Sequence, residues 1–385
     1  MWIGACASSV GTWMQMAAQS WLVLKLSGSP FLLGLDAFLS GIPIFLFSLV
    51  GGVVADRIER RKVLLTSQYI QMSAALLLTV LIAFHVIQVW HILCMSFVTG
   101  LAQAFGGPAY QALVPTLVSK EDMPNAIALQ SIQFNVARII GPVLGGFALA
   151  GLGEGWCFGL NAVSFLAPVI SLLMLKTRFY PEKTSETILA GVQQGIGFIR
   201  GQKAMVGLMV LAFLMTGLGV PMMTFLPVFA KDIFHRGPQV FTTFLAVSGC
   251  GSIVGALTVA ALGNVRHKGL IALIMLLSLG AAITGFALSP SLWFSYVMLF
   301  VSGASMISVF ALVNSLVQLI TTNEMRGRVM SVYNFAFRGG MPMGNLLTGW
   351  LVPLYSAPHV LAVNGALLAA VAVYFLAVQR RVAAL

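Results

Sequence analysis

The stretch Gly51–Lys62, GGVVADRIERRK, is a short charged turn between two long apolar segments, Phe31–Ala55 and Val63–Val86. Each of these segments is long enough to cross a bilayer as a helix, which needs about 20 mostly apolar residues. A helix is the favoured form there because it pairs its own backbone polar groups, for which hydrocarbon offers no partner. The stretch therefore predicts two membrane-spanning helices joined by a basic turn.

The composition of the whole chain also indicates a membrane environment. Of its 385 residues, 59% are hydrophobic and 8% are charged. A water-soluble domain with so few polar side chains could not cover its own surface, so lipid is the predicted solvent for most of them. The formal net charge of +11 is explained by anionic lipid and by membrane topology. It does not predict binding of nucleic acid.

The predicted fold class is an all-α polytopic membrane protein with 12 transmembrane helices. Apolar segments of suitable length lie at 2–26, 31–55, 63–86, 90–117, 125–152, 156–175, 205–234, 240–262, 269–288, 291–320, 329–354 and 359–378. The longer segments must tilt or project beyond the lipid. The first segment lacks the charged start and the cleavage site of a signal peptide, so we expect it to be a structural helix.

Lysine and arginine set the predicted orientation, because short cytoplasmic loops carry an excess of these residues. With the N-terminus inside, the inner loops hold most of the 21 Lys and Arg residues. The outer side holds Lys25, Lys231 and Arg236, while Arg138 and Arg338 fall within predicted helices. Both termini are therefore expected to be cytoplasmic.

The chain also has the pattern of a duplication. One long polar interruption divides six apolar segments from six, which predicts an N-terminal six-helix bundle at 1–175, a cytoplasmic linker at 176–204 and a C-terminal six-helix bundle at 205–385. At an offset of 200, Ser131, Arg138 and Pro142 match Ser331, Arg338 and Pro342. Two parallel repeats with this spacing predict two pseudo-symmetric bundles.

These motifs resemble those of the major facilitator superfamily over essentially the whole chain. The charged turn is similar to the signature G-x-x-x-D-R-x-x-R-R/K between the second and third helices, and Ala137–Gly146, ARIIGPVLGG, resembles the G-P-x-x-G-G motif of exporters. The stretches 117–142 and 324–349 are similar to the branch that contains the enterobactin exporter and the macrolide-efflux permeases. The resemblance implies a bacterial inner-membrane permease, expected to act as a monomer.

The resemblance assigns a gating role to the charged turn, whose motif residues are Gly52, Asp56, Arg57, Arg60, Arg61 and Lys62. Asp56 is expected to accept hydrogen bonds from the N-terminus of the eleventh helix near 327–329, while Arg57 and Arg61 meet carboxylates or lipid phosphates. The turn would then latch the two bundles together on the cytoplasmic side. The alternative is that its positive charges only anchor the topology.

A second motif lies in the fifth and eleventh predicted helices, at Arg138, Gly141, Pro142, Gly145, Gly146, Arg338 and Pro342. The glycines remove side-chain bulk and the proline removes a backbone hydrogen bond, which permits close helix contact and a kink. Ordinary packing and a specific role in alternating access are both open. Arg138 and Arg338 are expected either to face a central cavity and bind an anionic group or to pair with carboxylates.

Acidic residues within the spans are the candidates for proton coupling, because an ion in hydrocarbon is costly unless it is paired or hydrated. Asp36 and Asp232 are the two candidates. For Asp36 the simpler explanation is an ion pair with Lys25 across a short turn. Candidates for the substrate cavity are the polar residues Gln15, Gln19, Gln103, Tyr110, Gln111, Asn135, Asn314, Gln318 and Asn334. For each of these, hydrogen bonding between helices is the competing role.

Enzymatic chemistry has no support in the sequence. There is no phosphate-binding loop for nucleotides, no metal-binding motif and no soluble segment long enough for a catalytic core, so neither a metal nor a cofactor is expected. The functional hypothesis is a secondary transporter that exports a siderophore- or drug-like amphipathic molecule by alternating access, in exchange for protons. A nutrient importer of the same fold and a non-transporting membrane sensor are the alternatives.

Overall fold

The computed structural model describes residues 2–55, 57–119, 121–175, 188–263, 267–322, 324–383 and 385, and this part of the chain is helical without any strand. The helices of the first half are α1 (Trp2–Ser27), α2 (Pro30–Ala55), α3 (Arg60–Ala83), α4 (Val89–Leu113), η1 (Val114–Leu117), α5 (Met123–Gly151), α6 (Glu154–Ser164) and α7 (Leu166–Leu173). The others are α8 (Ile188–Gly201), α9 (Lys203–Gly219), α10 (Pro221–Val228), η2 (Phe229–Ile233), α11 (Pro238–Leu262), α12 (Lys268–Ala287), α13 (Leu292–Ile320), α14 (Arg326–Tyr355) and α15 (Ala357–Ala377).

Each of the twelve predicted segments overlaps a helix or a run of consecutive helices in the described part of the chain. Ten of these, the runs α6–α7 and α9–η2 included, are long and apolar enough to cross a membrane. The all-helical membrane fold is thereby confirmed. The exceptions are α1 and α14, whose serine, glutamine and arginine side chains lower their hydropathy. The count of twelve crossings therefore stays a prediction.

The chain divides into two compact units. Unit 1 comprises Met1–Ser185 together with Gly237–Thr243, and unit 2 comprises Glu186–Arg236 and Phe244–Leu385. The division after Ser185 falls within the predicted linker, of which 176–187 lie outside the described residues. Residues 188–201 of the linker form α8, and Lys203 begins α9.

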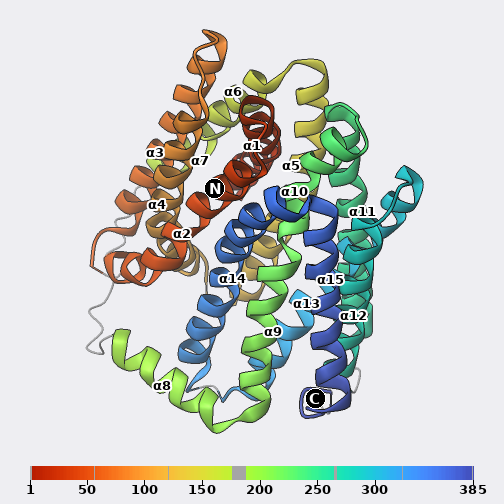
Figure 1. Ribbon diagram of the computed structural model, residues 1–385. Helices are drawn as coiled ribbons and strands as arrows, with labels where there is room; N and C mark the ends of the chain where they lie inside the picture. The colour runs from red at the N-terminus through yellow and green to blue at the C-terminus, as the bar shows by residue number, and fades with distance from the viewer. Residues whose placement is uncertain are drawn as a thin grey trace. The chain divides into compact units, whose positions relative to one another are not determined.

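Within unit 1 the main helix pairs are α2 with α4 and α1 with α5 (Figure 1). Glycine permits both approaches. A methyl group added at Gly141 would lie 2.5 Å from Cβ of Trp13, and one at Gly145 would lie 2.9 Å from the carbonyl oxygen of Met14. The α5 glycines therefore serve contact between helices, as their small size predicts.

Unit 2 repeats this device with different elements, because α14 packs on α9 and α12 packs on α15 and α13 (Figure 1). A methyl group at Gly340 would overlap Thr216 and Phe213 of α9, and one at Gly344 would overlap the backbone of Gly217. The four-residue spacing of Gly340 and Gly344 equals that of Gly141 and Gly145. Thus α5 packs on α1 in unit 1 as α14 packs on α9 in unit 2, each through glycines four residues apart.

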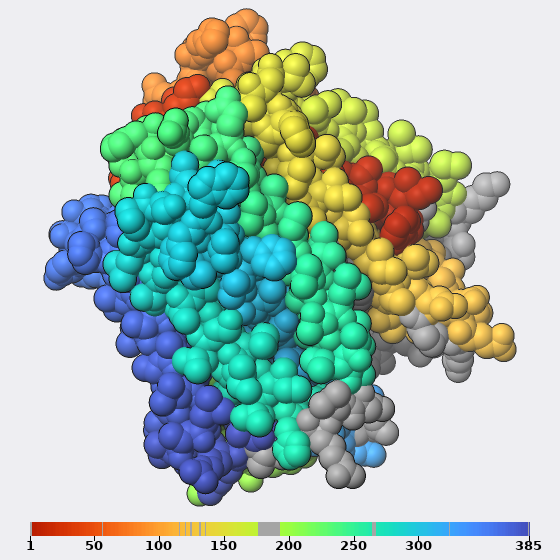
Figure 2. All heavy atoms as spheres, turned by 90° about the vertical axis from the view of Figure 1, so that its right-hand side faces the viewer, coloured from red at the N-terminus to blue at the C-terminus, as the bar shows by residue number. Residues whose placement is uncertain are grey.

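Figure 2 shows a face of unit 2 to which α11, α12 and α13 contribute, coloured green to cyan. These helices expose large apolar side chains to their surroundings, and Leu257 is 64% exposed and Trp293 80% exposed. Exposed apolar side chains of this size on successive helices are unfavourable in water and favourable in hydrocarbon. The surface agrees with the ten candidate spans in placing the helices in lipid.

Candidate functional site

A buried carboxylate in unit 1 is the centre of the candidate site. Asp36 of α2 is only 7% exposed, and its two oxygens accept hydrogen bonds from Nε2 of Gln19 at 3.1 and 2.9 Å. Oγ of Ser96, on α4, donates a third hydrogen bond to Asp36 at 2.5 Å and itself accepts one from Gln19 at 2.9 Å. Three helices, α1, α2 and α4, therefore meet at one carboxyl group.

The hydrogen bonds continue from this carboxylate to a fourth helix. Nε2 of Gln15 lies 3.5 Å from Oε1 of Gln19, and Nδ2 of Asn161, on α6, donates to Oε1 of Gln15 at 2.7 Å. Ser164 donates in turn to Oδ1 of Asn161 at 3.2 Å. Gln15 and Gln19 are one turn apart on α1, so a single face of that helix carries the connection. We call these side chains, with Asp36 and Ser96, the Asp36 network.

The expected ion pair between Asp36 and Lys25 is wrong. Nζ of Lys25 instead lies 2.6 Å from Oε1 of Glu154 at the start of α6, and the Lys25 side chain is 57% exposed. Among the described residues, the hydrogen-bond partners of Asp36 are neutral. Asp36 is therefore buried without an oppositely charged partner among the described residues, so no neighbouring ion offsets a change in its charge.

The second proton-coupling candidate has different surroundings. Asp232 lies in the π-helical turn η2 and is exposed. Its carboxylate is therefore not enclosed by other helices as that of Asp36 is. Of the two acidic candidates, only Asp36 occupies a built site.

A second polar cluster joins α4, α5 and α1. The hydroxyl of Tyr110 donates to Oε1 of Gln133 at 3.0 Å, and Nε2 of Gln133 donates to Oγ of Ser9 at 3.0 Å. Gln133 is 6% exposed, so these hydrogen bonds satisfy an amide that would otherwise be costly to bury. Tyr110 is thus tied to two other helices in this structure.

The remaining cavity candidates are distributed over both units. Gln103 accepts a hydrogen bond from Gln71 at 3.4 Å, and Asn314 accepts one from Gln318 on the same helix at 2.9 Å. Gln111 and Asn334 are exposed, and the side chain of Asn135 lies outside the described residues. Their contact with substrate stays a prediction. Ser96, Asn161 and Gln133 could not be selected from sequence alone, because uncharged polar residues are frequent in membrane helices.

The basic turn after α2 holds unit 1 together from within. Nη1 of Arg60 donates to the carbonyl of Ala112 at 2.9 Å, near the C-terminus of α4. Arg61 donates to the carbonyls of Leu175 and Leu173 at 2.6 and 2.9 Å, at the end of α7. Both guanidinium groups thereby satisfy carbonyls that a helix leaves free at its C-terminus. In the described part of the chain the partners of Arg61 are carbonyl oxygens, and its contact with a carboxylate or a lipid phosphate stays a prediction.

The other residues of this motif have fewer contacts. Nζ of Lys62 lies 3.5 Å from the buried carboxylate of Glu59, while Arg57 is exposed. A methyl group at Gly52 would meet no atom within 4 Å, whereas the neighbouring Gly51 lies against Ala104 of α4. The close-approach glycine of α2 is therefore Gly51, and Asp56 lies outside the described residues.

The two matched arginines lie midway along equivalent long helices. Arg138 is half-buried in α5 and Arg338 is exposed on α14, and neither forms an ion pair with a described residue. Pro142 and Pro342 each lie four residues further along, inside the same helices. The alternative in which these arginines pair with carboxylates has no support in the described part of the chain.

Comparison with known proteins agrees with this architecture. The family model described as a transmembrane secretion effector, within the major facilitator superfamily, matches residues 1–384. Macrolide efflux protein A of Streptococcus pyogenes is 22% identical over 97% of this chain and 93% of its own length. Enterobactin exporter EntS of Shigella boydii is 26% identical over 86% of this chain and 79% of its own.

A solved structure extends the comparison to the fold. The crystal structure of a POT family transporter in complex with a thioalcohol-conjugated peptide superposes with a TM-score of 0.76 at 11% identity, covering 98% of this chain and 96% of that one. The relatives and the structural neighbour are transporters and not enzymes. The resemblance seen in the sequence motifs is confirmed, and the chain belongs to the transmembrane secretion effector family of the major facilitator superfamily.

Proposed function

We propose that this protein exports an amphipathic small molecule of the siderophore or drug class, by alternating access, in exchange for protons. The single observation that carries export is the family match over residues 1–384, joined by relatives whose names describe efflux of macrolides and export of enterobactin. Both of those molecules are large and combine polar with apolar surface. A cavity that offers amides, hydroxyls and aromatic rings suits such a substrate.

The proposed carrier of the coupling proton is Asp36. Its carboxyl group accepts hydrogen bonds from an amide NH₂ and a hydroxyl, and both of these groups also contain an acceptor oxygen. When Asp36 takes up a proton, its O–H needs an acceptor, which Oε1 of Gln19 provides after the amide turns over. The network therefore offers hydrogen-bonding partners to both the protonated and the ionised carboxyl group. Among the described residues, no cation bonded to Asp36 favours the ionised form.

The same turn of the amide would carry the change along α1. Gln19 presents Oε1 to Gln15 in the observed arrangement, and Gln15 presents its own oxygen to Asn161. If the Gln19 amide reverses, its NH₂ group instead of Oε1 faces Gln15. The Gln15 amide must then also reverse, so that its oxygen accepts a hydrogen bond from that NH₂ group. Proton uptake at Asp36 is thereby linked to the polar face of α1.

The remaining parts of the proposal concern topology and gating. We propose twelve crossings arranged as two six-helix bundles, 1–175 and 205–385, with both termini in the cytoplasm and the protein acting as a monomer. Asp56 and Arg57 are proposed to gate through contacts made in only one conformation, while Arg60 and Arg61 stabilise unit 1. Arg138 and Arg338 are proposed to contact an anionic group of the substrate.

The test is uptake by inside-out membrane vesicles, with enterobactin and a macrolide as the two probes. A proton gradient, acidic inside, should drive uptake of at least one probe, and an uncoupler should abolish it. Asp36→Asn should lose gradient-driven uptake but keep exchange of labelled for unlabelled probe across the vesicle membrane. Asp232→Asn, the matched control, should behave as the unmodified protein. Uptake that ignores the uncoupler would remove the coupling, and no uptake of either probe would remove the substrate class.

A further inference from the structure

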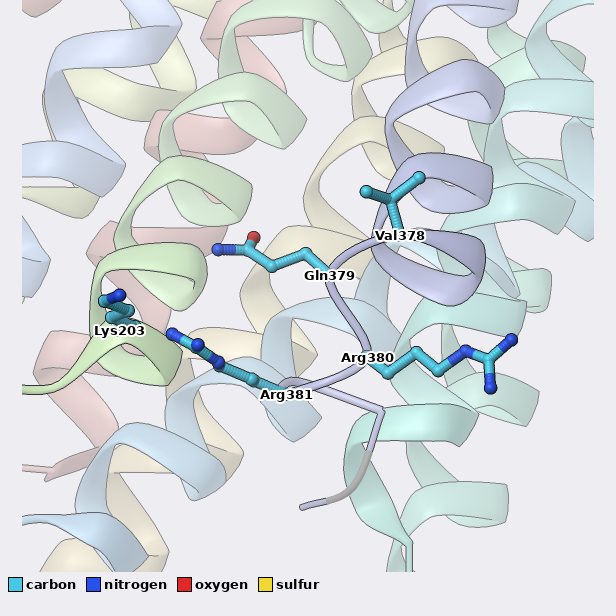
Figure 3. Close-up of a pocket in the computed structure, with 5 residues that line it drawn as sticks. All are labelled: Lys203, Val378, Gln379, Arg380 and Arg381. Carbon is cyan, nitrogen blue, oxygen red and sulfur yellow. The ribbon is translucent and has the colours of Figure 1, made fainter.

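An open cavity of about 630 Å³ lies in unit 2 where two candidate membrane spans end. Its lining residues are Lys203, Val378, Gln379, Arg380 and Arg381 (Figure 3). Lys203 is the first residue of α9, and the others follow directly after α15. Since both spans stop here, the cavity lies at the level where a bilayer changes from hydrocarbon to polar headgroups.

The segment after α15 is held in place by a buried anchor. Val382 is fully buried, and its Cγ2 would lie 3.0 Å from a methyl group added at Gly207 of α9. Its carbonyl oxygen lies against Gly269 of α12, where a methyl group would overlap it. Because only glycine leaves this space on both helices, the turn at 378–381 has a defined position beside the start of α9.

The basic side chains around the cavity differ in direction. Arg381 and Gln379 project toward Lys203, whereas Arg380 projects the opposite way (Figure 3). Nε of Arg380 lies 3.4 Å from the carbonyl oxygen of Ala377 at the end of α15. Lys203 and Arg381 form no ion pair with any described residue, and no described lining residue is acidic. Two cations and an amide thus converge on a space whose described lining includes no acidic residue.

We propose that this cavity binds the phosphate headgroup of an anionic phospholipid. A guanidinium and an ammonium group are the usual partners of phosphate, and the amide of Gln379 adds a neutral donor. The apolar Val378, which is 69% exposed, lines the cavity, and the exposed Tyr374 precedes it by one turn on α15, so both suit the acyl chains. This assignment holds for either membrane orientation and is independent of the exported substrate.

The topology rule and the proposed headgroup site predict different effects when the basic residues of this turn are substituted one at a time. The topology rule counts lysine and arginine near the ends of spans without regard to their direction. A headgroup site depends on Lys203 and Arg381 and is indifferent to Arg380. Arg380→Gln therefore removes the same charge from the same turn while leaving the proposed site intact.

The experiment measures lipid binding to the purified full-length protein in neutral detergent, by the rise in melting temperature during titration. The probes are dioctanoyl phosphatidylglycerol, dioctanoyl phosphatidylcholine and inorganic phosphate. Phosphatidylglycerol should bind best, and each of Lys203→Gln and Arg381→Gln should weaken it about fivefold, the factor expected per basic residue at an anionic lipid surface. Arg380→Gln should keep the affinity of the unmodified protein.

Each result decides the proposal. Equal losses for all three variants would overturn it in favour of unspecific attraction by net charge. Equal binding of phosphatidylglycerol and phosphatidylcholine would also overturn it, because the site would then not require an anion. Inorganic phosphate that binds as tightly as phosphatidylglycerol would show that the acyl chains contribute nothing and would replace the lipid by a free anion. Arg381→Lys, which keeps the charge, should restore binding and exclude a folding defect as the cause of the loss.

Discussion

Two adjacent glycines of α2, Gly51 and Gly52, should respond in opposite ways to the same substitution. A methyl group at Gly51 would lie 3.0 Å from the carbonyl carbon of Ala104 and 3.1 Å from Cα of Phe105, both on α4. The carbonyl oxygen of Ala104 would be nearer still. All three are backbone atoms, so relief requires α2 and α4 to separate. A methyl group at Gly52 would meet nothing within 4 Å.

The expected magnitudes follow from packing and from helix propensity. Forcing an extra methyl group into a packed interface costs about 1–3 kcal/mol. Replacing an unobstructed helical glycine by alanine stabilises the helix by about 0.5–1 kcal/mol. Because both substitutions gain the helix propensity of alanine, Gly51→Ala and Gly52→Ala should differ in unfolding free energy by the packing cost alone, about 1–3 kcal/mol.

The assay is unfolding of the purified protein in mixed micelles of neutral detergent and increasing SDS, followed by circular dichroism. Gly51→Ala should unfold at lower SDS than the unmodified protein, and Gly52→Ala at equal or higher SDS. Transport by Gly52→Ala separates the two roles open for this glycine. A stable variant that fails to transport places Gly52 in a contact made during gating. Equal destabilisation by both substitutions would refute the reasoning, because the difference in free space would then have no consequence.

Three further predictions concern the polar groups of unit 1. Asp36→Asn should leave the SDS midpoint within the error of the unmodified protein, since the Asn carbonyl oxygen still accepts the hydrogen bonds from neutral donors; a large loss of stability would mean that the charge is structural. Arg61→Gln should lower the unfolding free energy by about 1–2 kcal/mol, because it removes two charged hydrogen bonds to helix-end carbonyls. Arg57→Gln, at an exposed position, should leave that quantity unchanged, and equal effects of the two would contradict the capping role. Glu154→Gln should cost less than about 1 kcal/mol, because its partner Lys25 is largely exposed.

The apolar segments were predictable from sequence because each helix in lipid must satisfy its own backbone and needs about 20 apolar residues to do so. That rule is local, and so each predicted segment overlaps a helix or a run of consecutive helices in the described part of the chain. Partners across helices are not local. The sequence placed Lys25 and Asp36 near each other across one turn, but the structure joins Lys25 to Glu154, 129 positions away. Proximity in the sequence did not identify the ion-pair partner of Lys25, because helices far apart in the sequence pack side by side.

Glycine positions show a second limit of the same kind. The motif names Gly52 for gating, whereas the contact with α4 is made by Gly51, since the next residue along a helix is turned by about 100°. Gly141 and Gly145 of α5 are four residues apart and define one face, and the close helix contact expected of them is present, while a role in alternating access stays a prediction. A periodic pattern carries information on direction that a single motif residue lacks.

The two helices with the weakest membrane signal, α1 and α14, carry much of the candidate chemistry. Gln15 and Gln19 lower the hydropathy of α1, and Arg338 lowers that of α14. A polar side chain in a membrane helix costs free energy unless another group meets it, and for α1 those groups are Asn161, Asp36 and Ser96 on three other helices. Such compensation would allow a helix too polar to qualify by composition to be stable in lipid, as the predicted twelve crossings require. Arg338 has no ion-pair partner among the described residues, and the proposed function supplies one in an anionic group of the substrate.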